Sequence, residues 1–314
     1  MLTRLNALPP LAPDDILLVA CLRNEMLRLP WFLHYYRRLG IDRFLIVDNG
    51  SDDGSRAFIL EQEDVTVFHT EQSYADSGCG IDWQNALLRD HAVGHWTFVV
   101  DVDEIFVFPG CEATGLRRFL TYLDGKKATA VVAPMIDMYP GGAIAEAGYR
   151  AGQDPLEVAP FFDVEGYQLG GARSEARGLP VRGGPRHRLF WEGRGRDFPS
   201  PVLRKTPLLR WSATSELIAS THKVKGCSWA EVSGVLLHFK LLQDFAASAR
   251  EETARAQHFA DARQYRAYDE VISKREALTA YYEGSVRFRN TEQLCQLGLM
   301  RVPPAYSLLG NGVL

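Results

Sequence analysis

The chain has 314 residues, 46% of them hydrophobic, and a formal net charge of −4 at pH 7. This size allows a substantial core, in one large domain or in two closely associated ones, and the slight acidic excess argues against a general nucleic-acid-binding protein. The five cysteines are scattered and include no Cys-x-x-Cys pair, so they indicate free thiols in a reducing compartment, not a disulfide framework or a zinc site.

The sequence contains no sign of a membrane-spanning segment. No apolar run approaches the roughly 20 residues that a bilayer requires, and the N-terminus lacks the basic and apolar regions of a secretory signal. We therefore expect a cytoplasmic protein. Peripheral association with a membrane, beside lipid-linked intermediates, stays open.

The first 135 residues alternate strand-like and helix-like patterns, as in a parallel α/β sheet. Apolar runs predict strands over residues 16–21, 44–47, 65–68, 96–100 and 128–135. Between them, helical spacing predicts helices from Asn24 to Gly40, from Ser55 onward, and over residues 83–91 and 115–123.

Beyond residue 136 the pattern changes. Residues 137–205 are rich in Gly, Pro and Arg and predict loops and short strands, with Arg186 and Arg188 sharing one strand face. Strand-like pieces follow at 208–211 and 235–239, and helical sequence runs from 244 to about 282. We divide the chain into an α/β half (1–135), a loop-rich half (136–243) and a helical C-terminal extension (244–314).

The most informative segment is the predicted strand 96–100, which runs straight into Asp101, Asp103 and Glu104. Open α/β sheets bind ligands at the carboxyl ends of their strands. Magnesium and manganese take oxygen ligands and commonly link one or two carboxylates to substrate phosphates. The segment therefore predicts a cation site, although a lone Asp-x-Asp is more often a solvated loop.

Polar residues also follow the first two strands: Asn24 and Glu25 after one, and Asp48, Asn49 and Ser51 after the other. A carboxylate in the second place can accept hydrogen bonds from ribose hydroxyls or from a base N–H. The simpler interpretation is a helix cap at Asn24 and an ordinary turn after Asp48. No Gly-x-Gly-x-x-Gly follows the first strand, which argues against a nicotinamide enzyme.

These motifs, taken in order, resemble the family 2-type glycosyltransferases of the bacterial GT-A branch. The segments that carry the resemblance are 23–25, 29–31, 35–40, 47–54, 101–104, 161–163, 183–186, 205–208 and 237–240. Together they cover nearly the whole chain, and their order is far more specific than any one of them.

The resemblance implies a GT-A fold: a mostly parallel central sheet flanked by helices, a loop-rich acceptor half that completes the metal site, and a helical tail. It also implies a hexosyltransferase that moves a sugar from a nucleotide diphosphate, with UDP expected, to a hydroxyl of a carbohydrate or lipid-linked acceptor. Inversion at the anomeric carbon and a place in surface polysaccharide or glycan assembly are part of the same expectation. The oligomeric state is left open.

The resemblance further implies roles for individual residues. Contacts with the nucleotide sugar are expected from Asn24, Glu25, Asp48, Asn49, Ser51, Asp53, Asp101, Arg186 and Lys240. A Mn²⁺ or Mg²⁺ ion is expected on Asp101, Asp103 and His238, and a histidine ligand favours manganese. His238 has a second interpretation as a core histidine, and His222 is the competing ligand.

An inverting reaction also needs a carboxylate to take the proton of the acceptor hydroxyl. The candidates are Asp163, which we prefer slightly, Asp137 and Glu165, because the usual Glu-Asp pair of the family is missing here. Trp191 is the aromatic residue expected to stack on a sugar ring.

Two other functions stay open. A sugar-phosphate nucleotidyltransferase has the same needs for a sheet and a metal, but the chain lacks a Gly-rich loop after its first strand. A non-catalytic nucleotide- or carbohydrate-binding protein is the second alternative, and the intact acids at 101, 103 and 104 argue against it.

Overall fold

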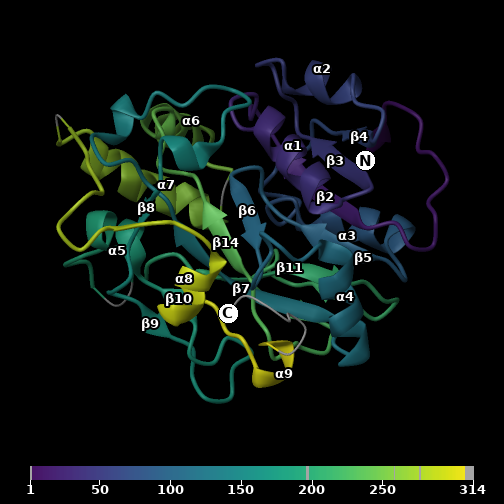
Figure 1. Cartoon of the computed structure of the whole chain (residues 1–314). Coiled ribbons are helices and arrows are strands. Elements are labelled where there is room, and N and C mark those ends of the chain that lie inside the picture. The colour runs from purple at the N-terminus through teal and green to yellow at the C-terminus, as the bar shows by residue number, and fades with distance from the viewer. Residues whose placement is uncertain (1, 196–197, 258, 276, 308–314) are drawn as a thin grey trace. The chain divides into compact units, whose positions relative to one another are not determined.

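The computed structural model describes residues 2–195, 198–257, 259–275 and 277–307 (Figure 1). The chain forms two compact units, each assembled from separate stretches of sequence. Unit 1 consists of residues 1–104, 113–132 and 206–230, and unit 2 of residues 105–112, 133–205 and 231–314.

Unit 1 is built on a mostly parallel sheet. Its strands, in spatial order, are β1 (Thr3–Arg4), β4 (Val65–His69), β3 (Arg43–Asp48), β2 (Leu17–Leu22), β5 (Trp96–Val99) and β11 (Arg204–Arg210). The pairs β4–β3, β3–β2 and β2–β5 are parallel, whereas β1 and β11 pair antiparallel at either side. The expected parallel α/β architecture is confirmed for this unit.

Helices follow the strands of unit 1 as the sequence predicts. They are α1 (Leu29–Leu39), α2 (Ser55–Leu60), α3 (Ile81–His91) and α4 (Leu116–Gly125). Helix α1 ends at Gly40, whose φ of 112° is one that glycine adopts without strain, and whose N–H donates to the carbonyls of Tyr36 and Arg37. The expectation that Asn24 caps this helix is wrong, because the N-cap is Arg28 and Asn24 lies in a turn with φ 55°.

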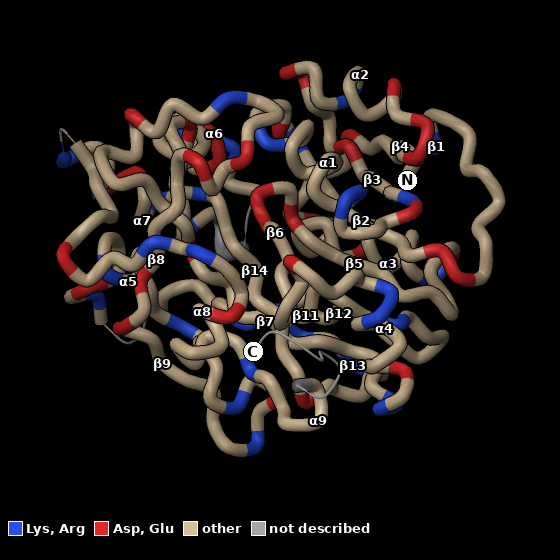
Figure 2. Tube along the Cα trace, in the orientation of Figure 1, with Lys and Arg blue, Asp and Glu red and all other residues tan. Residues whose placement is uncertain are grey.

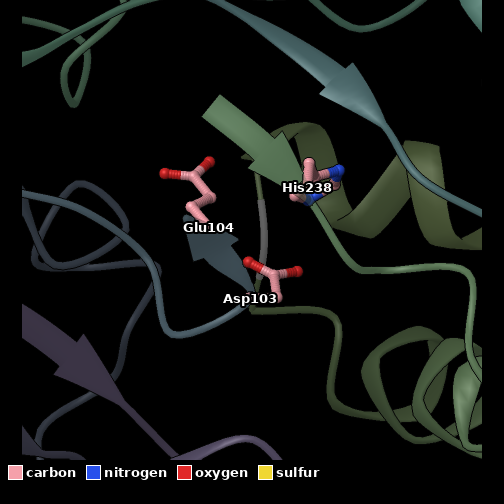
Figure 3. Close-up of side chains that lie close together, drawn as sticks. All are labelled: Asp103, Glu104 and His238. Atoms are coloured by element: carbon pink, nitrogen blue, oxygen red, sulfur yellow. The ribbon is translucent and has the colours of Figure 1, made fainter. Parts of the chain in front are cut away.

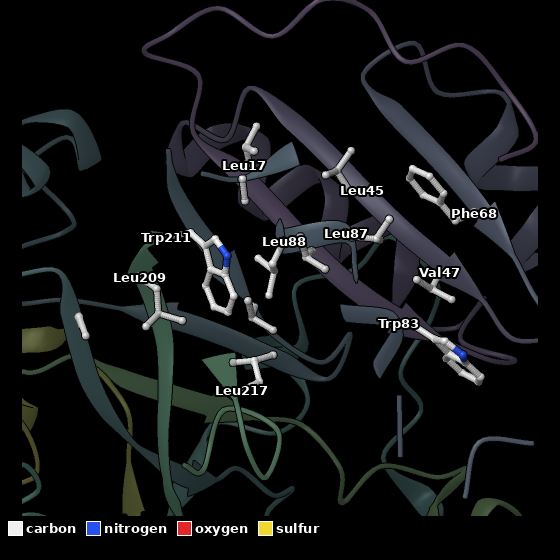
Figure 4. Packing of buried hydrophobic residues seen from close by; sticks show 14 residues of the cluster. Leu17, Leu45, Val47, Phe68, Trp83, Leu87, Leu88, Leu209, Trp211 and Leu217 are labelled. Atoms are coloured by element: carbon white, nitrogen blue, oxygen red, sulfur yellow. The ribbon is translucent and has the colours of Figure 1, made fainter. Parts of the chain in front are cut away.

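The two faces of the sheet are covered by different helices. Figure 4 shows Trp83, Leu87 and Leu88 of α3 packed with side chains of β2 and β3, in a buried cluster that also includes Val99. The neighbouring residue Phe98 contacts Tyr36 of α1, with ring centroids 5.8 Å apart. Since consecutive strand residues point to opposite faces, α3 and α1 cover opposite sides of the sheet.

Unit 2 contains a smaller set of strands, in the order β7 (Ala130–Asp137), β14 (Val235–His238) and β6 (Glu104–Val107). Strands β7 and β14 are parallel, with His238 opposite Asp137. Strand β6 was not expected, because the sequence was interpreted only as far as the acids that end at Glu104, and no strand was assigned to the apolar residues that follow.

The rest of unit 2 consists of short elements and helices. The short elements are η1 (Ile144–Glu146), η2 (Pro155–Glu157), β8 (Phe161–Phe162), β9 (Gln168–Leu169), β10 (Pro180–Arg182) and β15 (Val286–Arg287). The helices are α5 (Gly184–Phe190), α6 (Phe245–Arg255), α7 (Phe259–Ile272), α8 (Thr291–Gln296) and α9 (Pro304–Ser307). Of the predicted helical extension, residues 258, 276 and 308–314 lie outside the described residues.

Three further strand pairs are present among the described residues: β12 (Glu216–Leu217) with β13 (Val224–Lys225) in unit 1, and β10 with β9 and β15 with β8 in unit 2. The prediction that Arg186 and Arg188 lie on one face of a strand is wrong, since both residues lie on helix α5.

An aromatic core holds the helices of unit 2 together. Trp191, which is only 3% exposed, contacts Phe190, Phe198 and Tyr268, and Phe245 at the start of α6 joins the same cluster. Trp191 therefore packs the core, and the sugar-stacking role expected for it is wrong.

Charged residues of both signs are intermixed along the trace of the described residues (Figure 2). Among those residues, the structure contains no helix that has both the length and the apolar character needed to span a membrane.

Candidate functional site

The segments that follow the parallel strands of unit 1 are tied together at one edge of its sheet. The N–H of Asn49 donates to the carbonyl of Leu22 at 2.9 Å, and that of Thr70 donates to the carbonyl of Asp48 at 3.1 Å. The side-chain amide of Asn49 donates to the carbonyls of Thr70 and Gln72, at 3.1 and 3.0 Å. Asn49 therefore aligns the chain after β3 with the chain after β4.

A second set of bonds joins the loop after β2 to the loop after β3. The N–H of Asn24 donates to Oγ of Ser51 at 3.1 Å, and the N–H of Asp52 donates back to Oδ1 of Asn24 at 2.9 Å. The N–H of Met26 donates to Oδ2 of Asp53 at 2.9 Å. Asn24, Ser51 and Asp53, all expected near the nucleotide, thus hold the two loops against each other.

The carboxylate of Asp48, at the same edge of the sheet, is completely buried. Its Oδ2 lies 3.0 Å from Nδ1 of His69 and 3.8 Å from Nη1 of Arg56, and its Oδ1 accepts the N–H of Ser51 at 3.2 Å. Burial of a carboxylate is costly unless hydrogen bonds and charges compensate it, and here they do. Neither His69 nor Arg56 was recognised from the sequence.

Asp48 and Asp101 both act on the thiol of Cys21, which lies between the strands that precede them. Burial raises the pKa of Cys21 far above its ordinary value, and the negative charges of Asp101 and Asp48 raise it further. The carboxylates at the ends of β3 and β5 therefore stand on either side of β2 at one edge of the unit 1 sheet, and their expected contact with a nucleotide stays a prediction.

The acidic segment itself forms a tight turn at the end of β5. The N–H of Glu104 donates to the carbonyl of Asp101 at 3.1 Å, and the N–H of Asp101 donates to Oε2 of Glu104 at 3.2 Å. The backbone carbonyl of Glu104 accepts a 3.0 Å hydrogen bond from the hydroxyl of Tyr36 on α1. The side chain of Glu104 is fully buried, whereas Asp101 and Asp103 are partly exposed.

Strand β6 begins at Glu104 and neighbours β14, which ends at His238. Figure 3 labels Asp103 and Glu104, in the turn where β6 begins, and His238, at the end of β14. Asp103 belongs to unit 1 and His238 to unit 2. Carboxylates suit both cations, and an imidazole ligand favours Mn²⁺ over Mg²⁺. The metal-binding roles expected for Asp101, Asp103 and His238 stay predictions.

His222, the competing candidate for the histidine ligand, lies in unit 1. Its backbone N–H donates to the carbonyl of Ala219 at 3.1 Å and closes a turn. Glu25 is 3.6 Å from Arg28, and its side chain is 29% exposed. The expected contact of Glu25 with the nucleotide stays a prediction.

Two of the three candidate bases are engaged by arginines in unit 2. Asp137 is 1% exposed; its Oδ2 lies 2.8 Å from Nε of Arg186 and its Oδ1 lies 2.5 Å from Nδ1 of His238. Burial alone would raise the pKa of Asp137, but the charge of Arg186 and the hydrogen bond with His238 outweigh it and hold that pKa below its ordinary value. The carboxylate of Asp137 is thus kept ionised.

The pKa of Asp163 is shifted in the opposite direction from that of Asp137. It is 2% exposed, accepts a 2.6 Å hydrogen bond from the hydroxyl of Tyr139, and lies 3.0 Å from Nη2 of Arg188. Burial raises the pKa of Asp163 above its ordinary value, although the hydrogen bonds from Arg188 and Tyr139 lower it. Arg188 also lies 4.2 Å from the ring centre of Tyr282 and donates to the carbonyl of Ala280.

The remaining expected residues of unit 2 are Glu165 and Lys240. Glu165 is exposed. Lys240 donates to the hydroxyl of Tyr265 at 3.3 Å and lies 5.2 Å from the centre of its ring. The roles expected for these two residues stay predictions.

Comparison with known proteins assigns no family. No family model matches the sequence, and no curated protein matches it. Among solved structures, HddC from Yersinia pseudotuberculosis is similar over 74% of this chain and 79% of its own, at 7% identity and a TM-score of 0.30.

A second solved structure is a Bacillus anthracis protein named, provisionally, as a glucose-1-phosphate thymidylyltransferase, in complex with sucrose. The similarity covers 81% of this chain and 99% of that one, at 12% identity and a TM-score of 0.39. At these scores the likeness supports no argument about activity, and neither protein is named as a glycosyltransferase. The resemblance to family 2-type glycosyltransferases therefore stays a prediction.

Proposed function

We propose that this protein is a divalent-cation-dependent transferase that acts on a nucleotide-linked sugar. The observation that carries the proposal is the position of two carboxylates at the carboxyl edge of the unit 1 sheet: Asp48 ends β3 and Asp101 follows β5, and these strands lie parallel to β2 on either side of it. Open α/β folds bind ligands at this edge. The acidic turn that follows Asp101 supplies carboxylates of the kind that hold a cation on phosphates.

In this proposal Asp48 and Glu25 contact the ribose or base of the nucleotide, and Asn24, Asn49, Ser51 and Asp53 keep the surrounding loops in place. Asp101 and Asp103 are the carboxylates expected to bind Mn²⁺ or Mg²⁺, and His238 is the expected histidine ligand. When bound, the cation neutralises the charge that develops on the departing phosphate group. Arg186 and Lys240 remain candidates to assist through their positive charges.

The first reaction is glycosyl transfer from a nucleotide diphosphate, with UDP expected, to a hydroxyl of a carbohydrate or lipid-linked acceptor. The order of motifs along the chain supports it. Inverting transfer needs a base, and of the three candidates only Glu165 is exposed. We therefore rank Glu165 first among them, because Asp137 and Asp163 are both buried against arginines.

The second reaction is nucleotidyl transfer: an oxygen of a sugar phosphate attacks the α-phosphorus of a nucleoside triphosphate, and pyrophosphate leaves. The ion pairs of Asp137 and Asp163 favour this reaction. A sugar phosphate is already ionised at neutral pH, so that its attack requires no base from the protein.

Calorimetry with UDP, GDP, CDP and dTDP, each with Mn²⁺ and with chelator, tests the shared part of the proposal. We expect one nucleotide to bind at least about tenfold more tightly with Mn²⁺, and Asp103→Asn to abolish the difference. The exposed Asp52→Asn provides the matched control. Equal affinities in chelator and in Mn²⁺ for every nucleotide would refute a cation-dependent site.

Product analysis then separates the two reactions. Release of nucleoside diphosphate from a nucleotide sugar supports glycosyl transfer. Release of pyrophosphate from a nucleoside triphosphate and a sugar 1-phosphate supports nucleotidyl transfer. Nucleotide binding with neither product over a broad set of substrates would favour the non-catalytic alternative.

A further inference from the structure

The expected base Asp137 is bonded to the expected metal ligand His238, and both side chains belong to unit 2. They lie opposite each other on the parallel strands β7 and β14, and the N–H of Met138 donates to the carbonyl of His238 at 2.9 Å. Paired positions on neighbouring strands place their side chains on the same face of the sheet. The strand register therefore fixes the contact between the two groups.

This contact determines how His238 can bind a cation. Oδ1 of Asp137 lies 2.5 Å from Nδ1 of the imidazole, and the two residues are 1% and 4% exposed. An ionised carboxylate only accepts hydrogen bonds, so Nδ1 carries the proton and the ring lone pair is on Nε2. A metal-binding histidine commonly donates its other N–H to a carboxylate in this way, which orients the ring and raises its basicity.

Arg186 keeps that carboxylate charged and in place. Its Nε lies 2.8 Å from Oδ2, the oxygen that does not face His238, so each oxygen of Asp137 has its own partner. Arg186 is 3% exposed on helix α5, which starts immediately after Gly183. Gly183 has φ 115°, and a Cβ there would lie 2.2 Å from the carbonyl oxygen of Gly166, so only glycine permits this entry to the helix.

We propose that Asp137 and Arg186 are positioning residues, which hold His238 in the tautomer that presents Nε2 to a cation. This inference rests on the proposed cation-dependent function. It also replaces the base role expected for Asp137, because the carboxylate has both oxygens committed. Loss of a comparable carboxylate partner weakens metal binding by about 10–100-fold.

Titration of the full chain with Mn²⁺ alone, followed by electron paramagnetic resonance of the free ion, tests the proposal without any substrate. We expect Asp137→Asn to weaken Mn²⁺ binding by about 10–100-fold and Arg186→Lys, which retains a positive charge, to weaken it less than Arg186→Met does. Asp163→Asn is the matched control, since Asp163 is an equally buried acid paired with an arginine but bonded to Tyr139. Its Mn²⁺ affinity should match that of the wild type.

The two possible failures can be told apart. If the wild type binds no Mn²⁺, the proposed function fails and this inference fails with it. If the wild type binds Mn²⁺ and Asp137→Asn binds it equally well, only the inference is refuted.

Nuclear magnetic resonance of the metal-free wild type provides a test that does not depend on a variant that folds. Long-range ¹H–¹⁵N correlations of the His238 ring should show the proton on Nδ1. A proton on Nε2 would overturn the proposal. Rescue of Mn²⁺ affinity in Asp137→Glu, but not in Asp137→Asn, would support it further.

Discussion

Two aspartates of one loop illustrate how strongly local environment determines what a side chain can do. Asp48 is completely buried and is bound by His69, Arg56 and a backbone N–H, whereas Asp52, four residues later, is exposed. A carboxylate held by several partners keeps one orientation. The carboxylate of Asp48 is therefore fixed in place by the protein, whereas that of Asp52 is open to solvent.

We expect Asp48→Asn to weaken nucleotide binding by about 10–100-fold, because a hydrogen bond to a charged group contributes about 1.5–3 kcal/mol. The substitution should also lower the free energy of unfolding by about 1–3 kcal/mol through the loss of the His69 and Arg56 contacts. Calorimetry with nucleotide and Mn²⁺, and urea denaturation, measure the two effects. Unchanged affinity in Asp48→Asn, with Asp52→Asn as the control, would contradict the role of Asp48.

At the same scale, the sequence indicated which acids follow strands but not what they contact. Asp48 and Asp101 were placed correctly because each directly follows an apolar run. The contacts of Asp137 with Arg186 and His238 span 49 and 101 residues of sequence. Periodicity carries no information about such distant pairs, so Asp137 was interpreted as an available base.

At the scale of elements, the loop after β3 is held by side chains, not by regular structure. Asp53 accepts hydrogen bonds from the N–H groups of Met26 and Ser55, both at 2.9 Å, and so joins the loop after β2 to the start of α2. Ser55 in turn accepts the N–H of Glu25 at 3.0 Å. The order of this edge therefore depends on a few exposed or partly buried hydrogen bonds.

We expect Asp53→Ala to cost about 1–2 kcal/mol of stability and to speed amide hydrogen exchange at Met26 and Ser55. The rest of the unit 1 sheet should exchange at the wild-type rate, because its core contacts are intact. Hydrogen-exchange mass spectrometry measures this difference. Asp52→Ala is the control, and exchange at Met26 that is equal in both variants would show that the side chain of Asp53 does not hold the loop.

Helix α7 shows a pH-dependent contact of another kind. Glu270 lies 2.9 Å from Lys274 and 2.8 Å from Arg194. Hydrogen bonds with Lys274 and Arg194 lower the pKa of Glu270 from 4.5 to about 2. Since the pKa is lower in the folded state, the ion pairs stabilise the protein fully above pH 4.5, and this stabilisation is lost as the pH falls toward about 2.

The difference in melting temperature between the wild type and Glu270→Gln should therefore be constant above about pH 5.5 and should shrink as the pH falls below 4.5. Thermal melts from pH 7 down to pH 3 measure the trend. The exposed Glu283→Gln is the control. A difference that grows on acidification would contradict the sign of the shift.

The two elements that were not predicted from the sequence, β6 and α5, are both short. Strand β6 has only four residues, and its short apolar run follows the acids of the turn directly. Helix α5 has seven residues and opens with Gly184 and Pro185, which are typical of a turn. Both are held by tertiary contacts, in contrast to β2 and β3, whose continuous apolar runs were recognised.

At the scale of the whole molecule, the described C-terminal residues are integral to unit 2. Strand β15 pairs with β8, and Oγ1 of Thr291 donates to Glu112 at 2.6 Å. Leu294, Leu299 and Met300 are each at most 3% exposed. These contacts tie the described C-terminal residues to the core of unit 2.

Deletion of residues 284–314 should therefore destabilise the protein severely. Burial of three such side chains contributes on the order of 5–9 kcal/mol, which is comparable with the entire stability of a typical domain. We expect the melting temperature to fall by more than about 10 °C, or the protein not to fold. Leu294→Ala should cost less, about 2–5 kcal/mol, and an unchanged melting temperature in the deletion variant would contradict the prediction.

The setting of Cys21 makes this thiol a weak nucleophile although the residue is only partly buried. Desolvation and the charges of Asp101 and Asp48 raise its pKa and so suppress its thiolate, which is the form that alkylating reagents attack. Alkylation of Cys21 at neutral pH should therefore be slow, and negatively charged iodoacetate should react with it more slowly than neutral iodoacetamide.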